Sequence, residues 1–386
     1  MARKTRDQLN EIMKAFNTTR LWSFSRLNAY TTCSYSYFLK YIKREKEKQS
    51  SIYAILGGQF HDILEKFYKG KISYDEMIDE AEFAIMNTNM MDLKFNKNDD
   101  EKNNNIEEKY FTCIKHFFKT HVPITNKVMC EKFITIKIGN HYFQGYIDAI
   151  HKDDDGNFII TDYKSSTIYS GKKIHKEGKQ LMLYSLGLIQ QGCALEKIKI
   201  RWNFLKYISI TFMQKNGKEK TMNAERWAWV GKIKSKLRMN LKDDGNYSEE
   251  EIEDILTESI NNNDLKLLPQ YIQDLYTLSD CYVYIPIDAD ILKEFEVDLN
   301  RKIIEIYSKE ADYDKNHNSE IWEKEVDEGL LYFCSNICGY TASQCKCYKQ
   351  FLEKSDMFKK DEYKSINKNN QSNDDNDDWM KELGLI

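Results

Sequence analysis

The sequence predicts an α/β (α+β) fold in which helices flank a central mixed β-sheet. Two hairpin signals, Gly139-Asn140 and the acidic turn Asp153–Asn157, separate three apolar runs that are rich in β-branched residues. The helical stretch Ile174–Gln191 follows these runs and leads to a further strand, Ile198–Lys206. Strands followed by a crossing helix and another strand are typical of a mixed sheet with helical flanks.

The three runs are expected to form antiparallel strands in chain order. They are Phe133–Ile138, Tyr142–Ile150 and Phe158–Tyr163. Successive side chains of a strand point to opposite faces, so Asp162 and Lys164 share one face and Tyr163 points to the other.

Helices are expected both before and after these strands in the sequence. Before them, the predicted helices are Phe24–Lys43 capped by Ser23, a second helix opened by Gly57-Gly58 and stopped by Gly70, and most of Tyr74–Phe118 with a break at Asn96–Asn105. After them come a hairpin at Asn216-Gly217, helices at Ala224–Leu241, Glu249–Asn262 and Asp290–Tyr307, and a strand at Tyr282–Ile287.

The 386 residues suggest two domains, or one large domain with an appendage. We expect a polar N-terminal arm at 1–21, a helical region at 22–125, a core at 126–213, a helical and strand region at 214–363, and an acidic tail at 364–386. The low-complexity run Lys364–Asp378 is expected to be disordered.

Charge is unevenly distributed along the chain. Met1–Ser50 carries 11 Lys/Arg against 4 Asp/Glu, and the last sixteen residues carry 5 acids against 1 Lys. A basic N-terminal segment suits a polyanionic partner. The apolar tip Trp379–Ile386 is either a docking peptide for a protein partner or the end of a solubilising tail, and both interpretations stay open.

No run of residues approaches the ~18–20 apolar residues that cross a bilayer, and the N-terminus has no signal-peptide pattern. We therefore expect a cytoplasmic protein, where nine cysteines are not a disulfide framework. Four of them fall within Cys334–Cys347, and this clustering indicates a metal.

Two carboxylates and an ammonium lie among core-forming residues, at Asp148, Asp162 and Lys164. An unpaired buried charge is costly, and a divalent cation of the Mg²⁺ type prefers one or two carboxylates together with a substrate phosphate. Such an ion supports phosphodiester cleavage. The alternative is a surface salt bridge on an edge strand.

Other residues can join this group. Gln180 and Tyr184 lie four apart, hence on one face of the next helix. His61 lies on an earlier helix with Glu65 one turn on, although its apolar neighbours also suit a core histidine.

These residues occur in an order that resembles the RecB-like branch of the PD-(D/E)XK nucleases. The order is Gly58-x-x-His61-x-x-Leu64-Glu65, then Glu131, then Gly145-Tyr146-Ile147-Asp148, then Asp162-Tyr163-Lys164, then Gln180-x-x-x-Tyr184. The resemblance covers roughly Trp22 to Tyr348 and implies a restriction-endonuclease-like core. One departure is that the second acid is Asp rather than the commoner Glu.

The resemblance implies a metal-dependent deoxyribonuclease. Within that class it favours an exonuclease that acts on DNA ends in recombination, repair or replication. The compact, single-purpose character of the chain also suits a phage protein. Asp148 and Asp162 would bind Mg²⁺ or Mn²⁺, helped by His61 and the Tyr163 carbonyl. Lys164 would orient or activate water, Gln180 and Tyr184 would contact DNA or position Lys164, and Glu131 would be an accessory acid. A non-catalytic DNA-binding subunit and an RNA nuclease are the alternatives, and a helicase or single-strand-binding protein is the expected tail partner.

The cysteines extend the resemblance. Iron–sulfur nucleases of this branch, such as the AddB type and the CRISPR-associated RecB-like exonucleases, place one cysteine before and three after the nuclease core. This implies a [4Fe–4S] cluster on Cys33, Cys334, Cys338 and Cys345, with zinc as the rival metal. Cys347 competes with Cys345 as the last ligand. The remaining cysteines are expected to pack in the core.

Overall fold

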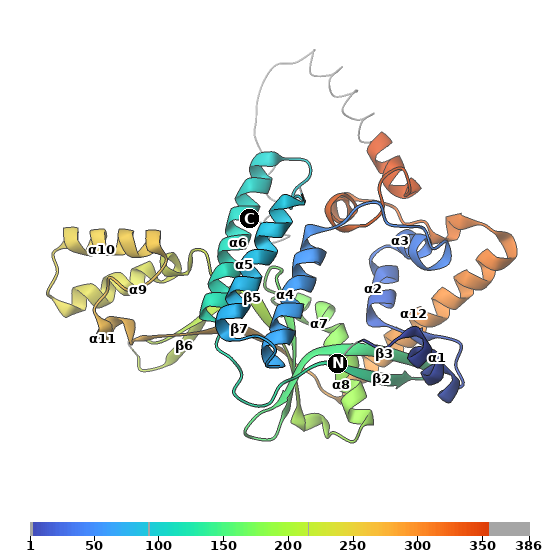
Figure 1. Cartoon of the computed structure of the whole chain (residues 1–386), viewed down its shortest axis with the longest axis horizontal. Helices are drawn as coiled ribbons and strands as arrows, with labels where there is room; N and C mark the ends of the chain where they lie inside the picture. The colour runs from blue at the N-terminus through green and yellow to red at the C-terminus, as the bar shows by residue number, and fades with distance from the viewer. Residues whose placement is uncertain (1–2, 92, 215, 355–386) are drawn as a thin grey trace, which may run out of the picture.

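The computed structural model describes residues 3–91, 93–214 and 216–354 (Figure 1). The predicted disordered run Lys364–Asp378 and the apolar tip Trp379–Ile386 lie outside these residues. No helix in the described ranges is both long and apolar enough to span a membrane.

The described residues form a seven-stranded mixed sheet, which confirms the predicted fold class. Its strands are β1 (Leu21–Trp22), β2 (Met129–Ile138), β3 (His141–Lys152), β4 (Phe158–Lys164), β5 (Ile198–Met213), β6 (Glu219–Glu225) and β7 (Tyr276–Ile285). The order is β1-β3-β4-β5-β6, with β2 paired to β3 and β7 paired to β5. β1 lies parallel to β3 and β4 parallel to β5, while the other pairs are antiparallel.

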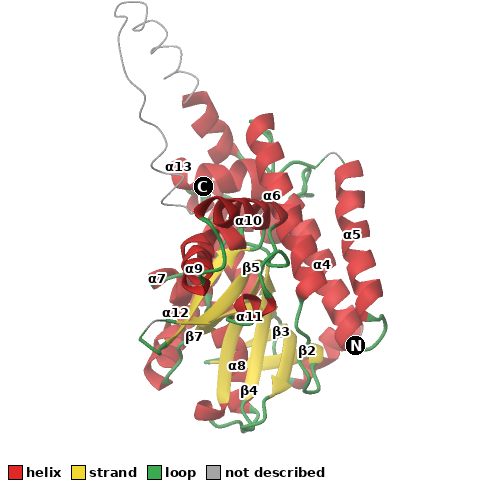
Figure 2. Cartoon of the chain, turned by 90° about the vertical axis from the view of Figure 1, so that its left-hand side faces the viewer, coloured by secondary structure: helices red, strands yellow, loops and turns green. Residues whose placement is uncertain are grey.

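Helices cover this sheet on both faces (Figures 1 and 2). The N-terminal helices are α1 (Arg6–Ala15), α2 (Phe24–Thr32), α3 (Ser34–Tyr37), α4 (Ile52–Tyr68), α5 (Tyr74–Met90) and α6 (Asp100–Thr120). Those that follow β4 are α7 (Lys172–Glu177), α8 (Lys179–Gln190), α9 (Trp229–Asp244), α10 (Glu249–Asn262), α11 (Gln270–Gln273), α12 (Ala289–Asn316) and α13 (Glu328–Tyr332). Short π-helical turns occupy Phe38–Ile42 and Phe333–Ile337, and 3₁₀ turns occupy Leu195–Lys197 and Ser319–Trp322.

Each face of the sheet has its own hydrophobic core. One core joins the sheet to α2, α8 and α12 and includes Ile150 and Ile160. The other joins it to α4, α5 and α6 and includes Ala149 and Tyr163. Alternation along β3 and β4 therefore sends neighbouring side chains to opposite cores, which fixes the register because a one-residue slip would exchange the two faces. A third core lies under α9 and α10, beside the far ends of β5 and β6.

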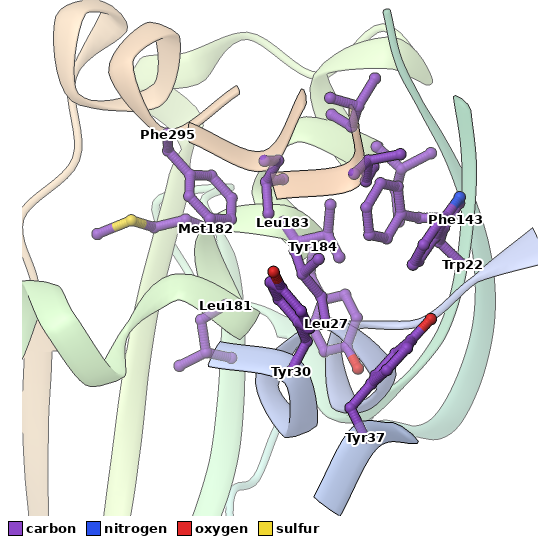
Figure 3. Close-up of a cluster of buried hydrophobic side chains, with 14 of the residues drawn as sticks. Trp22, Leu27, Tyr30, Tyr37, Phe143, Leu181, Met182, Leu183, Tyr184 and Phe295 are labelled. Carbon is purple, nitrogen blue, oxygen red and sulfur yellow. The ribbon is translucent and has the colours of Figure 1, made fainter. Parts of the chain in front are cut away.

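The first core brings distant parts of the chain together. Trp22, Leu27 and Tyr37 from the N-terminal segments face Leu183 of α8 and Phe295 of α12 (Figure 3). The Trp322 ring stacks on the rings of Tyr37 and Phe38, so the segment after α12 closes over the N-terminal helices.

Several predicted helix bounds are wrong. The predicted helix Phe24–Lys43 is interrupted at Cys33, whose backbone is extended and whose thiol accepts a hydrogen bond from the Ser36 amide. Gly57-Gly58 lies inside α4, which begins at Ile52, rather than opening the helix. The predicted Ala224–Leu241 helix begins only at Trp229, because residues up to Glu225 pair with β5.

Other elements differ in extent. The predicted helix Ile174–Gln191 is divided at Gly178, and the helix predicted from Asp290 continues to Asn316. α6 begins inside the predicted break, because Asp99 caps it by accepting from the Lys102 amide. β5 and β7 are longer than predicted, because they pair with each other over most of their length.

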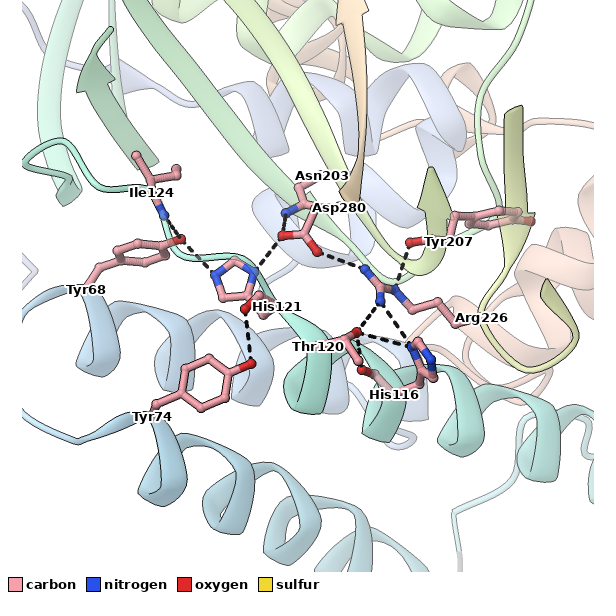
Figure 4. Close-up of polar contacts among 10 residues, drawn as sticks. All are labelled: Tyr68, Tyr74, His116, Thr120, His121, Ile124, Asn203, Tyr207, Arg226 and Asp280. Atoms are coloured by element: carbon pink, nitrogen blue, oxygen red, sulfur yellow. Dashed lines mark hydrogen bonds and ion pairs between the residues drawn. The ribbon is translucent and has the colours of Figure 1, made fainter. Parts of the chain in front are cut away.

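A buried polar network ties α4 and the end of α6 to β5, β7 and the turn between β6 and α9 (Figure 4). His121 Nδ1 donates to Asp280 over 2.6 Å, and the Tyr68 hydroxyl lies 2.8 Å from His121 Nε2. Arg226 donates to the other oxygen of Asp280 over 2.8 Å. These side chains are almost fully buried, so the ion pair and its hydrogen bonds satisfy groups that would otherwise be costly to bury.

Gly187 lets α8 approach β2 closely. A Cβ at this position would lie 2.5 Å from Ile134 Cδ1 and 2.7 Å from Ile136 Cγ1. We expect Gly187→Ala to lower the free energy of unfolding by about 1–3 kcal/mol, because overpacking outweighs the ~1 kcal/mol of helix propensity that alanine adds. Urea denaturation measures the change.

Gly231 of α9 is the matched control, since a Cβ there has nothing within 4 Å. Gly231→Ala is expected to stabilise the protein by up to about 1 kcal/mol. Equal effects of the two substitutions would contradict the close approach of α8 and β2.

Candidate active site

The β3–β4 hairpin places Asp148 opposite Asp162. The register pairs Ala149 with Thr161, so the two aspartates occupy the next cross-strand position. The turn that sets this register is held by Asp153, whose carboxylate accepts from the Asn157 amide. Both carboxylates are largely shielded from water, with side chains 13% exposed for Asp148 and 5% for Asp162.

Lys164 lies beside Asp162 in the site. Its ammonium lies 2.8 Å from Asp162 Oδ2. The Tyr163 side chain points the other way, into the core beneath α4. This arrangement matches the alternation expected from the sequence, and it puts the lysine and the two aspartates on one face of the hairpin.

His61 reaches Asp148 from α4. Its Nε2 atom lies 2.7 Å from the Tyr163 carbonyl oxygen, and its Nδ1 atom lies 3.2 Å from Asp148 Oδ2. Both partners are acceptors when Asp148 is ionised. His61 thus links the Tyr163 carbonyl of β4 to the Asp148 carboxylate of β3.

Burial and charge set the protonation of these groups. Burial, together with the nearby Asp162 carboxylate and against the opposing effect of His61, raises the pKa of Asp148 to about 7. Burial by itself would lower the pKa of Lys164, but the Asp162 and Asp148 carboxylates outweigh that effect and raise it. Lys164 consequently remains an ammonium in this site.

Glu131 of β2 lies across from Asp148 in a strained backbone conformation. Cys130 pairs with Ala149 and Lys132 pairs with Ile147, which leaves Glu131 and Asp148 facing each other between these pairs. The φ angle of Glu131 is +52°, which non-glycine residues adopt rarely and often at functional sites. Its carboxylate lies 3.5 Å from the Arg3 side chain.

Gln180 and Tyr184 support the site from α8. The Gln180 amide donates to the Tyr184 hydroxyl over 3.0 Å. Tyr184 is buried and packs on Gly145, where a Cβ would lie 2.5 Å from its ring. Burial raises the pKa of Tyr184, and the Asp148 and Asp162 carboxylates add to the effect. Tyr184 therefore exposes little surface itself and contacts β3 at Gly145.

The sequence did not point to two features of this region. Arg3 lies in the segment expected to be a polar arm, yet it pairs with Glu131, and the only sequence signal was the basic charge of the N-terminal segment. Glu65, one turn from His61, forms an ion pair with Lys69.

The cysteines form a second site. Cys33, Cys334, Cys338 and Cys345 line one small cavity together with Leu39 and Tyr348. Cys347 is buried next to them but does not line the cavity. Burial raises the pKa of the Cys33, Cys334 and Cys338 thiols. Among the described residues all the cysteines are free, so no disulfide competes for these thiols.

The family model for the PD-(D/E)XK nuclease superfamily matches residues 21–278. The chain belongs to this superfamily. Its members are nucleases that commonly use Mg²⁺ or Mn²⁺, and the family implies DNA as the substrate. Comparison with curated proteins gives no match. The matched region contains every residue from His61 to Tyr184 described above and ends before Cys334.

The carboxylates suit the divalent ion that these nucleases use. One oxygen each of Glu131, Asp148 and Asp162 is buried without a regular hydrogen bond, and each makes only an ion pair. Such oxygens are the ligands that a hard cation prefers. Across the described ranges, no three His, Cys, Asp or Glu side chains are placed to hold an ion by themselves. Water and a substrate phosphate would complete the coordination.

We expect Asp148→Asn to stabilise the metal-free protein at high pH. The pKa of Asp148 is about 7 when folded, above its usual 3.8, so its contribution to stability is complete below about pH 4 and is lost as the pH rises through 7. In EDTA, the variant should therefore melt at about the wild-type temperature near pH 4 and several degrees higher above about pH 8.

Asp62→Asn is the control, since it neutralises an exposed carboxylate on the same helix as His61. It should track the wild type at every pH. A difference between Asp148→Asn and wild type that does not grow with pH would contradict the unfavourable burial of the Asp148 charge.

Proposed function

We propose that this chain is a metal-dependent deoxyribonuclease of the RecB-like type, an exonuclease that acts on DNA ends during recombination, repair or replication. The observation that carries the proposal is the convergence of His61, Asp148, Asp162 and Lys164 at the β3–β4 hairpin. The order of these residues along the chain resembles that branch, and membership of the superfamily supports the chemistry.

In this proposal Asp148 and Asp162 hold Mg²⁺ or Mn²⁺, with Glu131 available as a third acid. When bound, the ion polarises a phosphoryl oxygen and lowers the pKa of a coordinated water. The high pKa of Asp148 means that protons compete with the metal near neutral pH. His61 and the Tyr163 carbonyl, 2.7 Å apart, lie where they can complete the site.

Lys164 acts through its charge in this scheme. Because its pKa is raised, it is a poor proton acceptor, and its ammonium instead orients water and stabilises negative charge that develops on the phosphate. Tyr184 packs on Gly145, three residues before Asp148, and Gln180 fixes its hydroxyl. The α8 pair thus acts as a support that keeps β3 in place.

Basic residues of α7 lie next in the chain after the catalytic strand. Lys172, Lys173 and Lys176 are exposed and can contact phosphates. Lys179, at the start of α8, instead pairs with Asp298 of α12 over 3.0 Å. Contact with phosphates here therefore depends on the three lysines of α7.

Degradation of end-labelled linear DNA tests the proposal. We expect Mg²⁺- or Mn²⁺-dependent release of label by the wild type, with Asp162→Ala and Lys164→Ala slower by about 10²-fold or more, as when a group that stabilises the transition state is removed. Asp62→Asn, beside His61 but exposed, should retain full activity.

The same assay separates the alternatives. Cutting of covalently closed circles would show an endonuclease, and preference for a matched RNA would show an RNA nuclease. If wild type and Asp162→Ala both bind DNA and neither cuts it with either metal, the protein is a non-catalytic subunit and the proposal is wrong.

We further propose that Cys33, Cys334, Cys338 and Cys345 bind a [4Fe–4S] cluster. Thiolates are the ligands of such clusters, and these four buried thiols line one cavity, although they are not arranged as a ready-made metal site. Tetrahedral zinc is the alternative. The cluster would fasten the N-terminal helices to the segment after α12. A link between residues 33 and 334 restricts the unfolded chain strongly, since it closes a long loop.

Anaerobic purification tests the cluster and its last ligand. The wild type is expected to be brown with about four irons per chain. Cys345→Ser should lose the colour and melt at a lower temperature, whereas Cys347→Ser, a neighbouring buried thiol outside the cavity, should keep both. A colourless protein with stoichiometric zinc would refute the cluster.

A further inference from the structure

A buried arginine lies on the face of the sheet opposite the Asp162 side chain. Arg201 of β5 pairs in register with Thr161 of β4, the residue just before Asp162. Neighbouring side chains of a strand point to opposite faces, so Arg201 and Thr161 share the face that Asp162 leaves. Arg201 is only 8% exposed. Its charge is therefore largely shielded from water, and a charge in that position needs a partner.

The contacts of this arginine are all with neutral groups in the described part of the chain. Its Nε donates to Thr161 Oγ1 over 3.0 Å, and its Nη1 donates to the Tyr284 hydroxyl over 2.9 Å. The guanidinium carbon lies 3.6 Å from the centre of the Tyr282 ring. A ring face attracts a cation but does not neutralise it. The Nη2 nitrogen donates to none of these partners, so part of the guanidinium fork is unused.

The carboxylates on nearby strands already have other partners. Asp280 of β7 binds His121 and Arg226, and Asp153 at the end of β3 pairs with Lys199 over 3.4 Å. Arg226 shows the contrast within this protein, because its own buried charge lies 2.8 Å from Asp280 Oδ1. Removing one partner of such a buried pair is strongly destabilising. Arg201 is thus a buried cation without the anion that Arg226 has.

A buried histidine on the same face adds a second unsatisfied group. His151 of β3 pairs with Ile159, two residues before Thr161, so it shares the face of Arg201. It is 6% exposed, and its Nδ1 atom is buried without a hydrogen-bond partner among the described residues. Burial lowers the pKa of His151 to about 4, and the charge of Arg201 adds to this effect. The imidazole is therefore neutral at pH 7, and an anion nearby would be favoured by Arg201 without opposition from a carboxylate here.

Solvent reaches this group at the outer strand. β7 pairs only with β5 among the described strands, and its Tyr284 side chain is 48% exposed. The Tyr284 hydroxyl accepts from Arg201, which leaves its own hydrogen available to a ligand. An unused guanidinium N–H beside a hydroxyl is a donor set that binds phosphate oxygens, because hydrogen bonds to an ionised acceptor are the strong ones.

We propose that Arg201 and Tyr284 bind a phosphate group, either inorganic phosphate or the phosphate of a mononucleotide. The bound anion would neutralise the buried guanidinium, as Asp280 does for Arg226. Because Asp162 points to the other face of the sheet, this phosphate is separate from the one that the candidate active site would attack. The site therefore stands whether or not the chain is a nuclease.

Melting of the metal-free protein in EDTA near pH 7.5 tests the site. The probes are inorganic phosphate, deoxyadenosine monophosphate and acetate, each up to about 20 mM at constant ionic strength, and the dependence of the melting temperature on concentration gives Kd. The wild type is expected to melt at a higher temperature in phosphate or in the nucleotide than in acetate. For Arg201→Met we expect at least about 10-fold weaker binding, and for Tyr284→Phe about 10-fold, as when a hydrogen bond to a charged group is lost.

Arg238→Met is the matched control, since it removes the same charge from a partly exposed arginine of α9. Its shift in phosphate should equal that of the wild type. The comparison is made between buffers within each variant, so a change in basal stability does not enter it. If Arg201→Met does not fold, Tyr284→Phe, which alters a half-exposed side chain, carries the test.

The probes also separate the possible ligands. A larger shift with the nucleotide than with phosphate would assign the site to a mononucleotide, and equal shifts would assign it to the phosphate group alone. Equal shifts in all four proteins would overturn the site, because they would reflect a general effect of phosphate on hydration or binding elsewhere. No shift in the wild type would also overturn it. An equal shift in acetate would exclude phosphate as the specific ligand.

Discussion

The structure depends on holding two carboxylates next to each other inside the protein. Asp148 and Asp162 lie at facing positions of β3 and β4, where both are shielded from water and repel each other. His61 and Lys164 offset part of this cost. The remainder has to come from the packing of the sheet, because only a rigid strand pair keeps two such groups together.

That rigidity comes from cores on both faces of the hairpin. Tyr163, between Asp162 and Lys164, is anchored beneath α4, and the buried Tyr68–His121–Asp280 network holds the same helix to β7. On the opposite face, Ile150 and Ile160 pack into the core that includes α8. The site thus lies where two independent cores meet, and a change in either one reaches it.

The sequence predicted the central part of the site because local rules act there. A hairpin turn sets the register, and strand alternation then places Asp162 and Lys164 together. The helix break at Cys33 could not be predicted, since it places the thiol in a cavity that forms only when distant segments of the chain pack together. Contacts between distant segments, such as Arg3 with Glu131 and Tyr184 with Gly145, leave no periodic pattern in the sequence. The long β5–β7 pairing was missed for the same reason.

The first core has a consequence for how the protein is made. It contains Trp22, near the beginning of the chain, and Cys345, close to the end of the described residues. The ribosome makes the chain from its N-terminus, so this core cannot be completed until the segment around Cys345 has been made. A chain that stops before Cys345 lacks this part of the core.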